Sequence, residues 1–413
     1  MPVLRVAVLI DLPREAASGG HVKYWERVAQ AAVKQNAPID LTLYFSGAGA
    51  DEILSPHVRL RFLPPVFSTA RLKFLPYVPA HTDLAPFHPR LARELPQYDV
   101  LHATDGFFAF ARTAERIAKR RKIPLATSFH TDTPAYAELF TRQTLTGLLG
   151  KKFGGWLDSV MKISKRERAS KDKRLADHLR VCSAVLAMRP EDIALAQSVA
   201  GADKIKPMRL GVDKDIFMPR PDARGAIEEE YQIAQRKFLV LFVGRVDAGK
   251  NVPLLIEACV QVLEKGIPLH LAVVGQGPLC DAVKTKLGEH ATLTGLLPAE
   301  KLAQFYAAAD CLAMTSDIEI GGLIGVEALA CGCPVLTSKQ SGVAQLCGET
   351  AAMRQVESRE AAWADALACL AQDRGEQTAM REAALDFRRD KLAGWDDVLK
   401  EDFMPVWQAL TKS

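Results

Sequence analysis

Short, almost continuous apolar runs alternate along the chain with longer stretches of helical periodicity. The runs lie at 5–11, 39–45, 58–64, 98–104 and 124–130, and again at 237–244, 269–275, 291–295, 311–316 and 334–338. Strands that are buried on both faces lose the polar alternation, so these runs are typical of parallel sheets covered by helices. Because the pattern occurs twice, the sequence predicts an α/β fold with two doubly wound, Rossmann-like domains.

A stretch rich in proline and charge, GVDKDIFMPRPDARG, divides the two halves. It predicts an N-terminal domain at 1–210, a linker at 211–235 and a C-terminal domain at 236–390. The length of 413 residues suits two such domains. Open α/β domains bind ligands at the carboxyl ends of their strands, so we expect the site in a cleft between the domains.

Composition excludes some classes of protein. The net charge of +4 is too small to indicate a nucleic-acid partner. No apolar run reaches the roughly 20 residues of a membrane-spanning helix, and the start MPVLRVAVLIDLP is expected to be a buried strand. All 8 cysteines lie between Cys182 and Cys369 without the spacing of a zinc site, so we expect reduced thiols and a cytoplasmic location.

The stretch FVGRVDAGKN at 242–251 follows a predicted strand and precedes a predicted helix. Gly244, Gly249 and Lys250 have the spacing of a P-loop, but Asn251 stands where a P-loop has the Ser or Thr that ligates magnesium. Arg245 and Lys250 beside a helix N-terminus suit a diphosphate in either case, and a solvated charged turn is the alternative.

Two candidates follow strands of the first half. Gly19 and Gly20 precede a helix, where exposed amides can face a phosphate, although a flexible turn explains them equally well. His130 ends the run at 124–130, where an imidazole could bond a substrate hydroxyl. A lone histidine is more often structural, and for His102 in DVLHATDG the structural interpretation is preferred.

The segment MTSDIEIGGLIGVEALACGCPVLTS predicts a strand, a glycine-bearing loop and a short helix. Its loop amides and helix N-terminus can face an anion or sugar hydroxyls. Glu319 lies in the loop, and Glu327 follows eight residues later, about two turns into the helix, where it reaches another part of the ligand.

At this point the chain resembles the retaining GT-B glycosyltransferases of family 4, also called glycosyltransferase group 1. Glu319 to Glu327 matches the E-x7-E motif of that family, and EALACGCPVLTS is similar to its EAMACGxPVV. The segments SFHTDTPAY, LGVDKDIFMP, FVGRVDAGKN, VVGQGP, LTGLLP and YAAADC occur in the family's order. Ile320 stands where the family often has Phe, and Asn251 needs no hydroxyl because the family uses no magnesium on the nucleotide.

The resemblance implies a metal-independent retaining hexosyltransferase that needs no cofactor. It would move a sugar from a nucleoside-diphosphate sugar to a hydroxyl of a glycan or lipid-linked acceptor. The acceptor hydroxyl would attack the sugar on the same face from which the leaving group departs. The implied catalytic residues are His130, Glu319, Arg245 and Lys250. The implied donor-binding residues are Gly19, Gly20, Gly244, Arg245, Lys250, Glu319, Gly321, Gly322, Leu323 and Glu327, of which Glu327 would bind the ribose.

Other interpretations stay open. A nucleotide-sugar epimerase or hydrolase of the same fold would share these motifs, and a P-loop nucleoside triphosphatase rests only on Gly244 to Lys250. Asp213 and Asp215 form a D-x-D, which binds metal in another glycosyltransferase fold, but they lie in the predicted linker and no metal site is expected. The sequence does not choose between UDP, GDP and ADP, and it does not identify the sugar, the acceptor or the oligomeric state.

Two further segments, residues 148–180 and 391–413, could form contacts outside the predicted site. Residues 148–180 combine ten lysines and arginines with four acids and several large apolar residues. This segment could bind the anionic inner face of the cytoplasmic membrane, or it could be a solvated helix, and both remain open. The last segment, 391–413, could pack back on the first domain as a helix, as in similar proteins.

Overall fold

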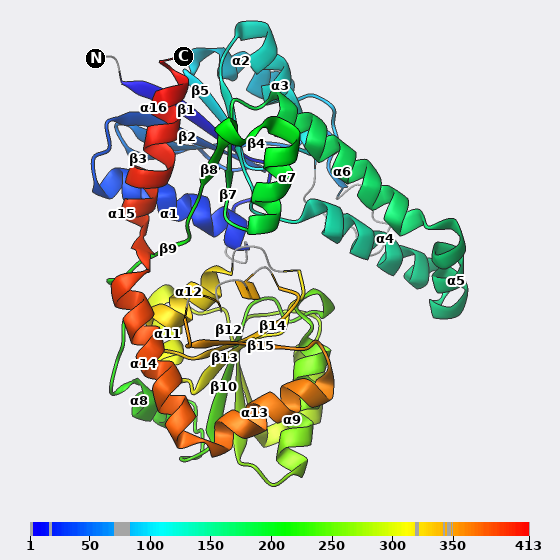
Figure 1. The fold of residues 1–413 in the computed structure, drawn as a ribbon, viewed down its shortest axis with the longest axis vertical. Helices are drawn as coiled ribbons and strands as arrows, with labels where there is room; N and C mark the ends of the chain where they lie inside the picture. The colour runs from blue at the N-terminus through cyan, green and yellow to red at the C-terminus, as the bar shows by residue number, and fades with distance from the viewer. Residues whose placement is uncertain are drawn as a thin grey trace. The chain divides into compact units, whose positions relative to one another are not determined.

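The computed structural model describes residues 3–15, 19–69, 83–318, 322–341, 343–344, 348 and 350–412. The chain forms two compact units, Met1–Arg209 with Trp395–Ser413 and Leu210–Gly394 (Figure 1). The predicted linker at 211–235 lies inside the second unit. Its proline and charge suggested a connector, but Phe217 and Ile227 are buried in the core of that unit.

The first unit is built on an eight-stranded sheet with the order β3-β4-β2-β1-β5-β6-β7-β8. All neighbouring strands are parallel apart from β3 and β4. The order changes direction at β1, so the crevice beyond the carboxyl ends of β1 and β5 is where this topology binds ligands. The strands are β1 Leu4–Ile10, β2 Ile39–Ser46, β3 Glu52–Ser55, β4 Val58–Leu63, β5 Val100–Ala103, β6 Leu125–Ser128, β7 Ala184–Ala187 and β8 Ile205–Pro207.

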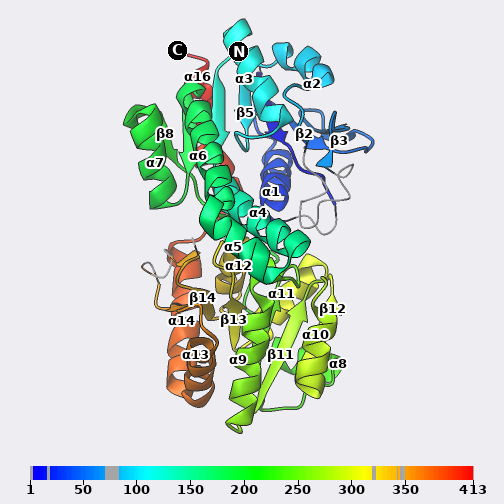
Figure 2. The same cartoon turned by 90° about the vertical axis from the view of Figure 1, so that its right-hand side faces the viewer.

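The helices of the first unit include three that extend from the sheet as an arm (Figure 1), and Figure 2 shows this arm pointing toward the viewer. These are α4 Thr133–Leu149, α5 Lys151–Met161 and α6 Ile163–Val181. Asp132 caps α4 by accepting a hydrogen bond from the amide of Ala135 at 2.9 Å. Residues 1–209 also form α1 Gly20–Lys34, α2 Pro89–Glu94, α3 Ala109–Arg121 and α7 Pro190–Ala200.

Residues Trp395–Ser413 belong to the first unit although they end the chain. They form α15 Trp395–Asp397, a π-helical turn at Val398–Phe403 and α16 Met404–Leu410. Asp402 anchors them, because its carboxylate accepts hydrogen bonds from the backbone amide of Arg209 at 2.8 Å and from its guanidinium at 2.6 Å. In the described part of the chain, no helix combines the length and apolar character needed to cross a bilayer.

The second unit has a six-stranded, fully parallel sheet with the order β12-β11-β10-β13-β14-β15. Its strands are β10 Phe238–Val243, β11 Leu269–Val274, β12 Ala291–Gly295, β13 Cys311–Met314, β14 Val335–Ser338 and β15 Met353–Val356. A separate parallel pair, β9 Gly211–Val212 and β16 Ala393–Gly394, joins the two ends of the unit.

Helices cover both faces of the second sheet. Successive residues of β10 alternate between two apolar clusters, one shared with α8, α11, α12 and α14 and the other with α9, α10 and α13. Burial on both faces explains the continuous apolar run of this strand. The helices are α8 Ala223–Glu230, α9 Val252–Glu264, α10 Cys280–Leu287, α11 Ala299–Ala308, α12 Leu323–Ala330, α13 Glu360–Gln372 and α14 Arg374–Asp390.

Candidate active site

The turn after β10 carries the predicted diphosphate-binding residues. Asp247 accepts a hydrogen bond from the amide of Lys250 at 3.0 Å and stabilises a 3₁₀ turn at Ala248–Lys250. Asn251 then adopts the left-handed conformation, with φ of 55°, before α9 begins. Asparagine tolerates this conformation better than most residues, so its presence has a backbone reason that involves no metal.

Two glycines of the neighbouring VVGQGP turn hold this loop in place. A Cβ added at Gly275 would stand 1.9 Å from the carbonyl oxygen of Gly244, and one at Gly277 would stand 2.3 Å from that of Val246. The amide of Val246 donates to the carbonyl of Gln276 at 3.0 Å. The turns after β10 and β11 are therefore in backbone contact, which only glycine allows at these positions.

The two predicted cations differ in their surroundings. The side chain of Arg245 is 60% exposed and its Nε lies 2.6 Å from the carboxylate of Asp247. The backbone of Lys250 is fixed, because its carbonyl accepts a hydrogen bond from Thr315 Oγ1, just after β13, at 2.7 Å. Lys250 and Ile324 also line a small cavity of about 10 Å³, so the lysine lies beside the first turn of α12.

Helix α12 begins at a glycine and carries the predicted ribose-binding carboxylate. Gly322 caps it with φ of +61°, and a Cβ there would stand 2.2 Å from Val343. Glu327 is half-buried and accepts a hydrogen bond from the hydroxyl of Tyr306 at 3.2 Å. Leu323 occupies the first helical position. The predicted Glu319 and Gly321, with Ile320, lie outside the described residues.

Tyr306 was not predicted as a site residue, although YAAADC was recognised as a motif. The side chain is fully buried. Burial, and then the charge of Glu327, raise the pKa of the Tyr306 hydroxyl well above its ordinary value. The hydroxyl therefore stays protonated and donates to Glu327, which orients the carboxylate.

In the first unit, His130 lies against an aromatic cluster. Its ring stacks on His21 with centroids 4.6 Å apart and planes 9° apart. Its Nε2 lies 3.1 Å from Trp25 Nε1 and 2.8 Å from Ser128 Oγ. Because an indole N–H can only donate, Nε2 of His130 is an acceptor. A neutral His130 therefore carries its proton on Nδ1, which has no partner among the described residues.

Burial keeps this histidine neutral. It lowers the pKa of His130 well below its ordinary value, and the nearby His21 and His102 lower it further. Burial also lowers the pKa of His21 and of His102 to about 3. At neutral pH, His130 is therefore a hydrogen-bond donor through Nδ1–H and carries no charge, which suits a sugar hydroxyl better than a phosphate.

His102 is fully buried with both ring nitrogens bonded, in line with its expected structural role. Nδ1 accepts a hydrogen bond from Trp407 Nε1 at 3.0 Å, and Nε2 lies 2.9 Å from Ser128 Oγ. A hydrogen-bonded chain thus runs from Trp407 through His102 and Ser128 to His130. Trp25, Ser128 and Trp407 were not predicted as site residues, and only Ser128 had a local signal, because it lies two positions before His130.

The predicted glycine pair is accessible. Gly19 caps α1 in an extended conformation, with φ of −71°, and no described heavy atom lies within 4 Å of the position a Cβ would take. Gly20 is the first residue of the 15-residue helix. The first amides of α1 are therefore open to an anion from this side.

The D-x-D pair has a local structural role. Asp213 Oδ1 accepts a hydrogen bond from the amide of Asp215 at 3.1 Å and closes a turn. Within the ranges that the structure describes, no cluster of three or more His, Cys, Asp or Glu side chains could hold a metal ion.

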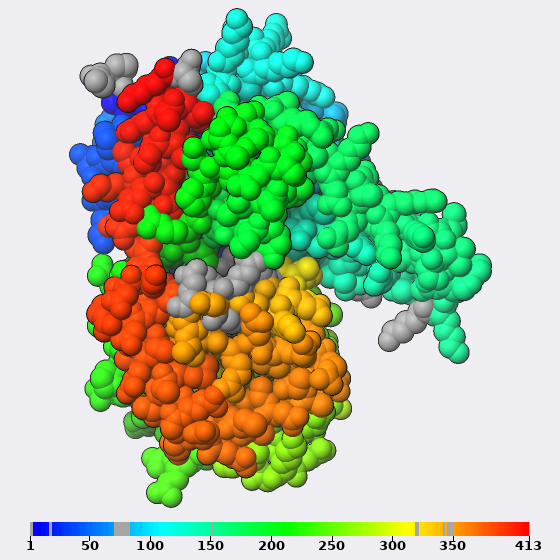
Figure 3. Space-filling model, in the orientation of Figure 1, coloured from blue at the N-terminus to red at the C-terminus, as the bar shows by residue number. Residues whose placement is uncertain are grey.

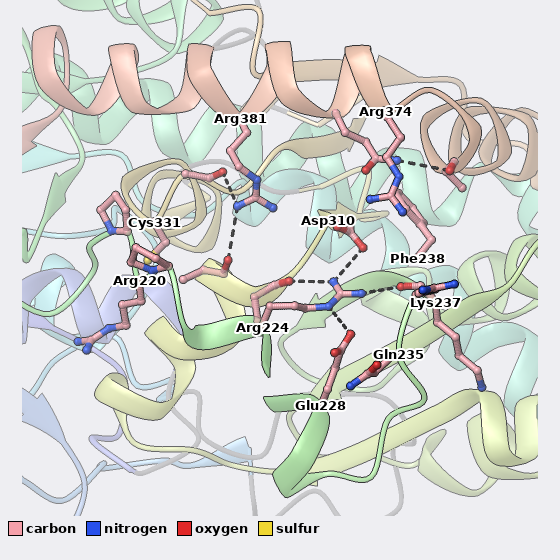
Figure 4. Close-up of a pocket in the computed structure, with 18 of the residues that line it drawn as sticks. Arg220, Arg224, Glu228, Gln235, Lys237, Phe238, Asp310, Cys331, Arg374 and Arg381 are labelled. Atoms are coloured by element: carbon pink, nitrogen blue, oxygen red, sulfur yellow. Dashed lines mark hydrogen bonds and ion pairs between the residues drawn. The ribbon is translucent and has the colours of Figure 1, made fainter. Parts of the chain in front are cut away.

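A cavity of about 590 Å³ lies elsewhere in the second unit, at the amino ends of β10 and β13 (Figure 4). Two of the arginines that line it, Arg224 and Arg381, are engaged with protein groups. Arg224 bonds to Asp310 at 2.9 Å and to Glu228 at 2.6 Å, and Arg381 donates to the carbonyl of Ala309 at 2.7 Å. Because parallel α/β sheets bind ligands at the opposite edge, we assign these arginines to packing rather than to the active site.

Known proteins are similar to the second unit in sequence and to the whole chain in fold. Residues 223–387 match the family model described as glycosyl transferases group 1. The sulfoquinovosyl transferase of Arabidopsis thaliana is 29% identical over 265 residues, which is 63% of this chain and 47% of that relative. The chain therefore spans about half the length of that curated relative.

Solved structures show the fold. Sucrose-phosphate synthase from Thermosynechococcus elongatus superimposes with a TM-score of 0.72 at 18% identity, covering 99% of this chain and 100% of that one. Anabaena HepE, solved in complex with UDP and glucose, has a TM-score of 0.68 at 15% identity, with coverage of 99% and 100%. The chain thus has the GT-B fold of two Rossmann-like domains, and its residues 223–387 are similar to the glycosyl transferases group 1.

Proposed function

We propose that the protein is a metal-independent retaining glycosyltransferase that uses a nucleoside-diphosphate hexose. The observation that carries the proposal lies at the carboxyl edge of the second sheet. Thr315 ties the turn bearing Arg245 and Lys250 to the end of β13, and α12 with Glu327 follows. Cations, helix amides and a carboxylate on one edge are what a diphosphate joined to a ribose requires.

Each residue has a proposed role in this reaction. Arg245 and Lys250 hold the diphosphate, and Glu327, oriented by Tyr306, binds the ribose hydroxyls. Glu319 and the amides around Gly321 and Gly322 bind the sugar. The amides at Gly19 and Gly20 approach a phosphate, and the Nδ1–H of His130 donates to a hydroxyl of the transferred sugar.

The proposed chemistry is a substitution at the anomeric carbon. The bond between this carbon and the diphosphate oxygen breaks, so negative charge develops on the leaving group, where fixed cations lower the barrier. The acceptor hydroxyl forms its bond on the face that the diphosphate leaves, and its proton passes to a phosphate oxygen. The acceptor is a glycan or a lipid-linked hydroxyl in the cytoplasm.

Calorimetry tests the donor site. Binding of UDP, GDP and ADP is measured with a metal chelator and compared with binding of ATP with magnesium. We expect one diphosphate to bind without metal, and Lys250→Ala and Glu327→Ala to weaken it about tenfold or more, since each removes a charge-assisted hydrogen bond. Lys265→Ala is the matched control, because this exposed lysine of the same unit pairs with Asp365 instead.

Two outcomes would contradict the proposal. Binding of ATP alone, dependent on magnesium and unaffected by Glu327→Ala, would indicate a P-loop enzyme. Turnover of the donor without any acceptor, to a free or epimerised sugar, would favour a hydrolase or epimerase. Retention is tested separately by NMR of the product, in which an inverted anomeric configuration would exclude it.

A further inference from the structure

Helix α5, in the arm of the first unit, turns an apolar face toward solvent. Phe153, Trp156 and Val160 follow one another at spacings of three and four residues, so they lie on one side of the helix. Their exposed fractions are 55%, 56% and 59%. An amphipathic helix of a globular unit normally buries this side. Helix α5 instead exposes its apolar side to solvent.

The opposite side of α5 explains why the helix keeps this orientation. Gly154 and Asp158 lie on that side and are buried. A Cβ at Gly154 would stand 2.4 Å from the carbonyl oxygen of Leu145, so α5 touches the backbone of α4 there. Asp158 accepts hydrogen bonds from the amide and the hydroxyl of Ser164, at 2.8 Å and 2.7 Å, at the start of α6.

Exposed apolar residues also lie at both ends of α5. Leu148 and Leu149 at the end of α4, and Met161 at the end of α5, are 56%, 41% and 46% exposed. The rings of Phe153 and Trp156 stack with centroids 5.8 Å apart. We call these six residues the α5 apolar face: Leu148, Leu149, Phe153, Trp156, Val160 and Met161. The arm that carries it stands out from the sheet of the first unit (Figures 1 and 3). A contiguous exposed apolar patch marks an interaction surface.

Positive charge borders this face and is not neutralised by the arm itself. Each of the four acids between 148 and 180 lies within 4.0 Å of an arginine or lysine of the arm. The exposed Lys152, Lys162, Lys165 and Arg166 have no acidic partner among the described residues. Lys152 and Lys162 adjoin Phe153 and Met161 in sequence, and Lys165 and Arg166 lie in the first turn of α6. Large apolar side chains with unpaired cations beside them are complementary to a surface of anionic headgroups over acyl chains.

We propose that the arm docks on an anionic lipid bilayer through the α5 apolar face, with the surrounding lysines and arginines against the headgroups. Two copies of the face would bring like charges together, so a bilayer suits it better than a second copy of the chain. The proposal goes beyond donor chemistry and does not depend on it. If the acceptor is lipid-linked, the same contact brings the enzyme to its substrate.

Vesicle co-sedimentation tests the proposal. We expect the protein to sediment with phosphatidylcholine vesicles that contain phosphatidylglycerol, not with phosphatidylcholine alone, and less as salt rises. Phe153→Ser with Trp156→Ser should weaken binding about tenfold or more, through lost apolar burial. Lys162→Glu with Lys165→Glu should have a similar effect through charge. Ile53→Ser is the matched control, because this residue of the same unit is 82% exposed but lies on β3.

Tryptophan fluorescence gives an independent readout. Of the 5 tryptophans, Trp156 alone is exposed, and the others are at most 8% accessible. A shift of the emission to shorter wavelength with anionic vesicles therefore reports burial of Trp156 in lipid. Trp156→Phe should abolish the shift and retain most of the sedimentation. An unshifted emission in the presence of anionic vesicles would overturn the proposal.

Other results would overturn it as well. Equal sedimentation with neutral and anionic vesicles, or full binding by the double serine variant, would exclude the proposed contact. Self-association that the serine variant abolishes, without vesicle binding, would assign the face to a second copy. Unchanged far-ultraviolet circular dichroism of each variant shows that lost binding is not misfolding. A wild-type protein that binds vesicles but no nucleotide would contradict the proposed function only.

Discussion

Trp407 donates its indole N–H to Nδ1 of His102 at 3.0 Å, although 305 residues separate the two in sequence. The bond fixes the proton of neutral His102 on Nε2, which can then donate to Ser128, 2.9 Å away. It also attaches the last helix of the chain to the sheet of the first unit. The C-terminal segment therefore orders the surroundings of His130, the residue that we place at the reacting sugar.

Replacing Trp407 by Phe tests this bond. The substitution keeps an aromatic ring but leaves Nδ1 of His102 buried without a donor. We expect this to lower the free energy of unfolding by about 1–3 kcal/mol, in addition to the cost of the smaller side chain. Trp363→Phe is the matched control. Trp363 is equally buried, but its N–H has no hydrogen-bond partner among the described residues. Urea unfolding should show a larger decrease in unfolding free energy for the unit that carries Trp407→Phe than for the unit that carries Trp363→Phe. Equal decreases would contradict the assigned bond.

The stability of the first unit should depend on pH through His102. Burial holds its folded pKa at about 3, whereas the unfolded histidine titrates near its ordinary value. Below about pH 6.5 the unfolded chain takes up a proton that the folded chain does not, so the stability that neutral His102 contributes is lost as pH falls.

His102→Gln removes this dependence while retaining a group that can donate to Ser128. We expect the variant to be less stable than the wild type at pH 7, and the gap to narrow by about 2 kcal/mol at pH 5, because one linked proton changes the free energy by about 1.4 kcal/mol per pH unit. Urea unfolding at the two pH values measures it. If the difference in unfolding free energy between wild type and variant does not change with pH, folded His102 takes up a proton as readily as unfolded His102.

The pattern of the chain predicts most of the sheets, because a strand buried on both faces leaves a long apolar run. The runs at 39–45 and 237–244 are strands β2 and β10 for this reason. The four-residue strands β7 and β15 were not predicted. A run this short resembles a piece of buried helix, and only pairing with its neighbours distinguishes the two.

The candidate site also contains both residues that the sequence predicted and residues that it did not. Lys250 and Glu327 were predicted because a glycine turn, a helix start and a charge lie close together in sequence. Tyr306 and Trp407 act through contacts with residues 21 and 305 positions away, and no local pattern marks such pairs. The basic segment 148–180 was recognised from its composition, but only the packing of Gly154 against α4 shows that the apolar side of α5 faces out.

The glycine turn of the second unit should tolerate no side chain at Gly277. A Cβ there would stand 2.3 Å from the carbonyl oxygen of Val246, a backbone atom that cannot move alone. We expect Gly277→Ala to cost roughly 3 kcal/mol or more and to weaken nucleotide binding, because the turn that holds Arg245 must shift. Gly225→Ala is the control, since the same unit leaves open space around that position. Thermal unfolding and calorimetry measure the two effects, and equal behaviour of the two variants would contradict the assigned contact.

Tyr306 should act on donor affinity through Glu327. Tyr306→Phe removes the hydroxyl that donates to the carboxylate at 3.2 Å and keeps the buried ring. We expect nucleoside-diphosphate affinity to fall about three- to tenfold, in proportion to the loss of one hydrogen bond that orients Glu327. Calorimetry with the matching 2′,3′-dideoxynucleotide separates orientation from a general structural effect. That ligand lacks the ribose hydroxyls, so it should bind wild type and variant equally, and an equal loss for both ligands would mean that Tyr306 stabilises the unit without positioning Glu327.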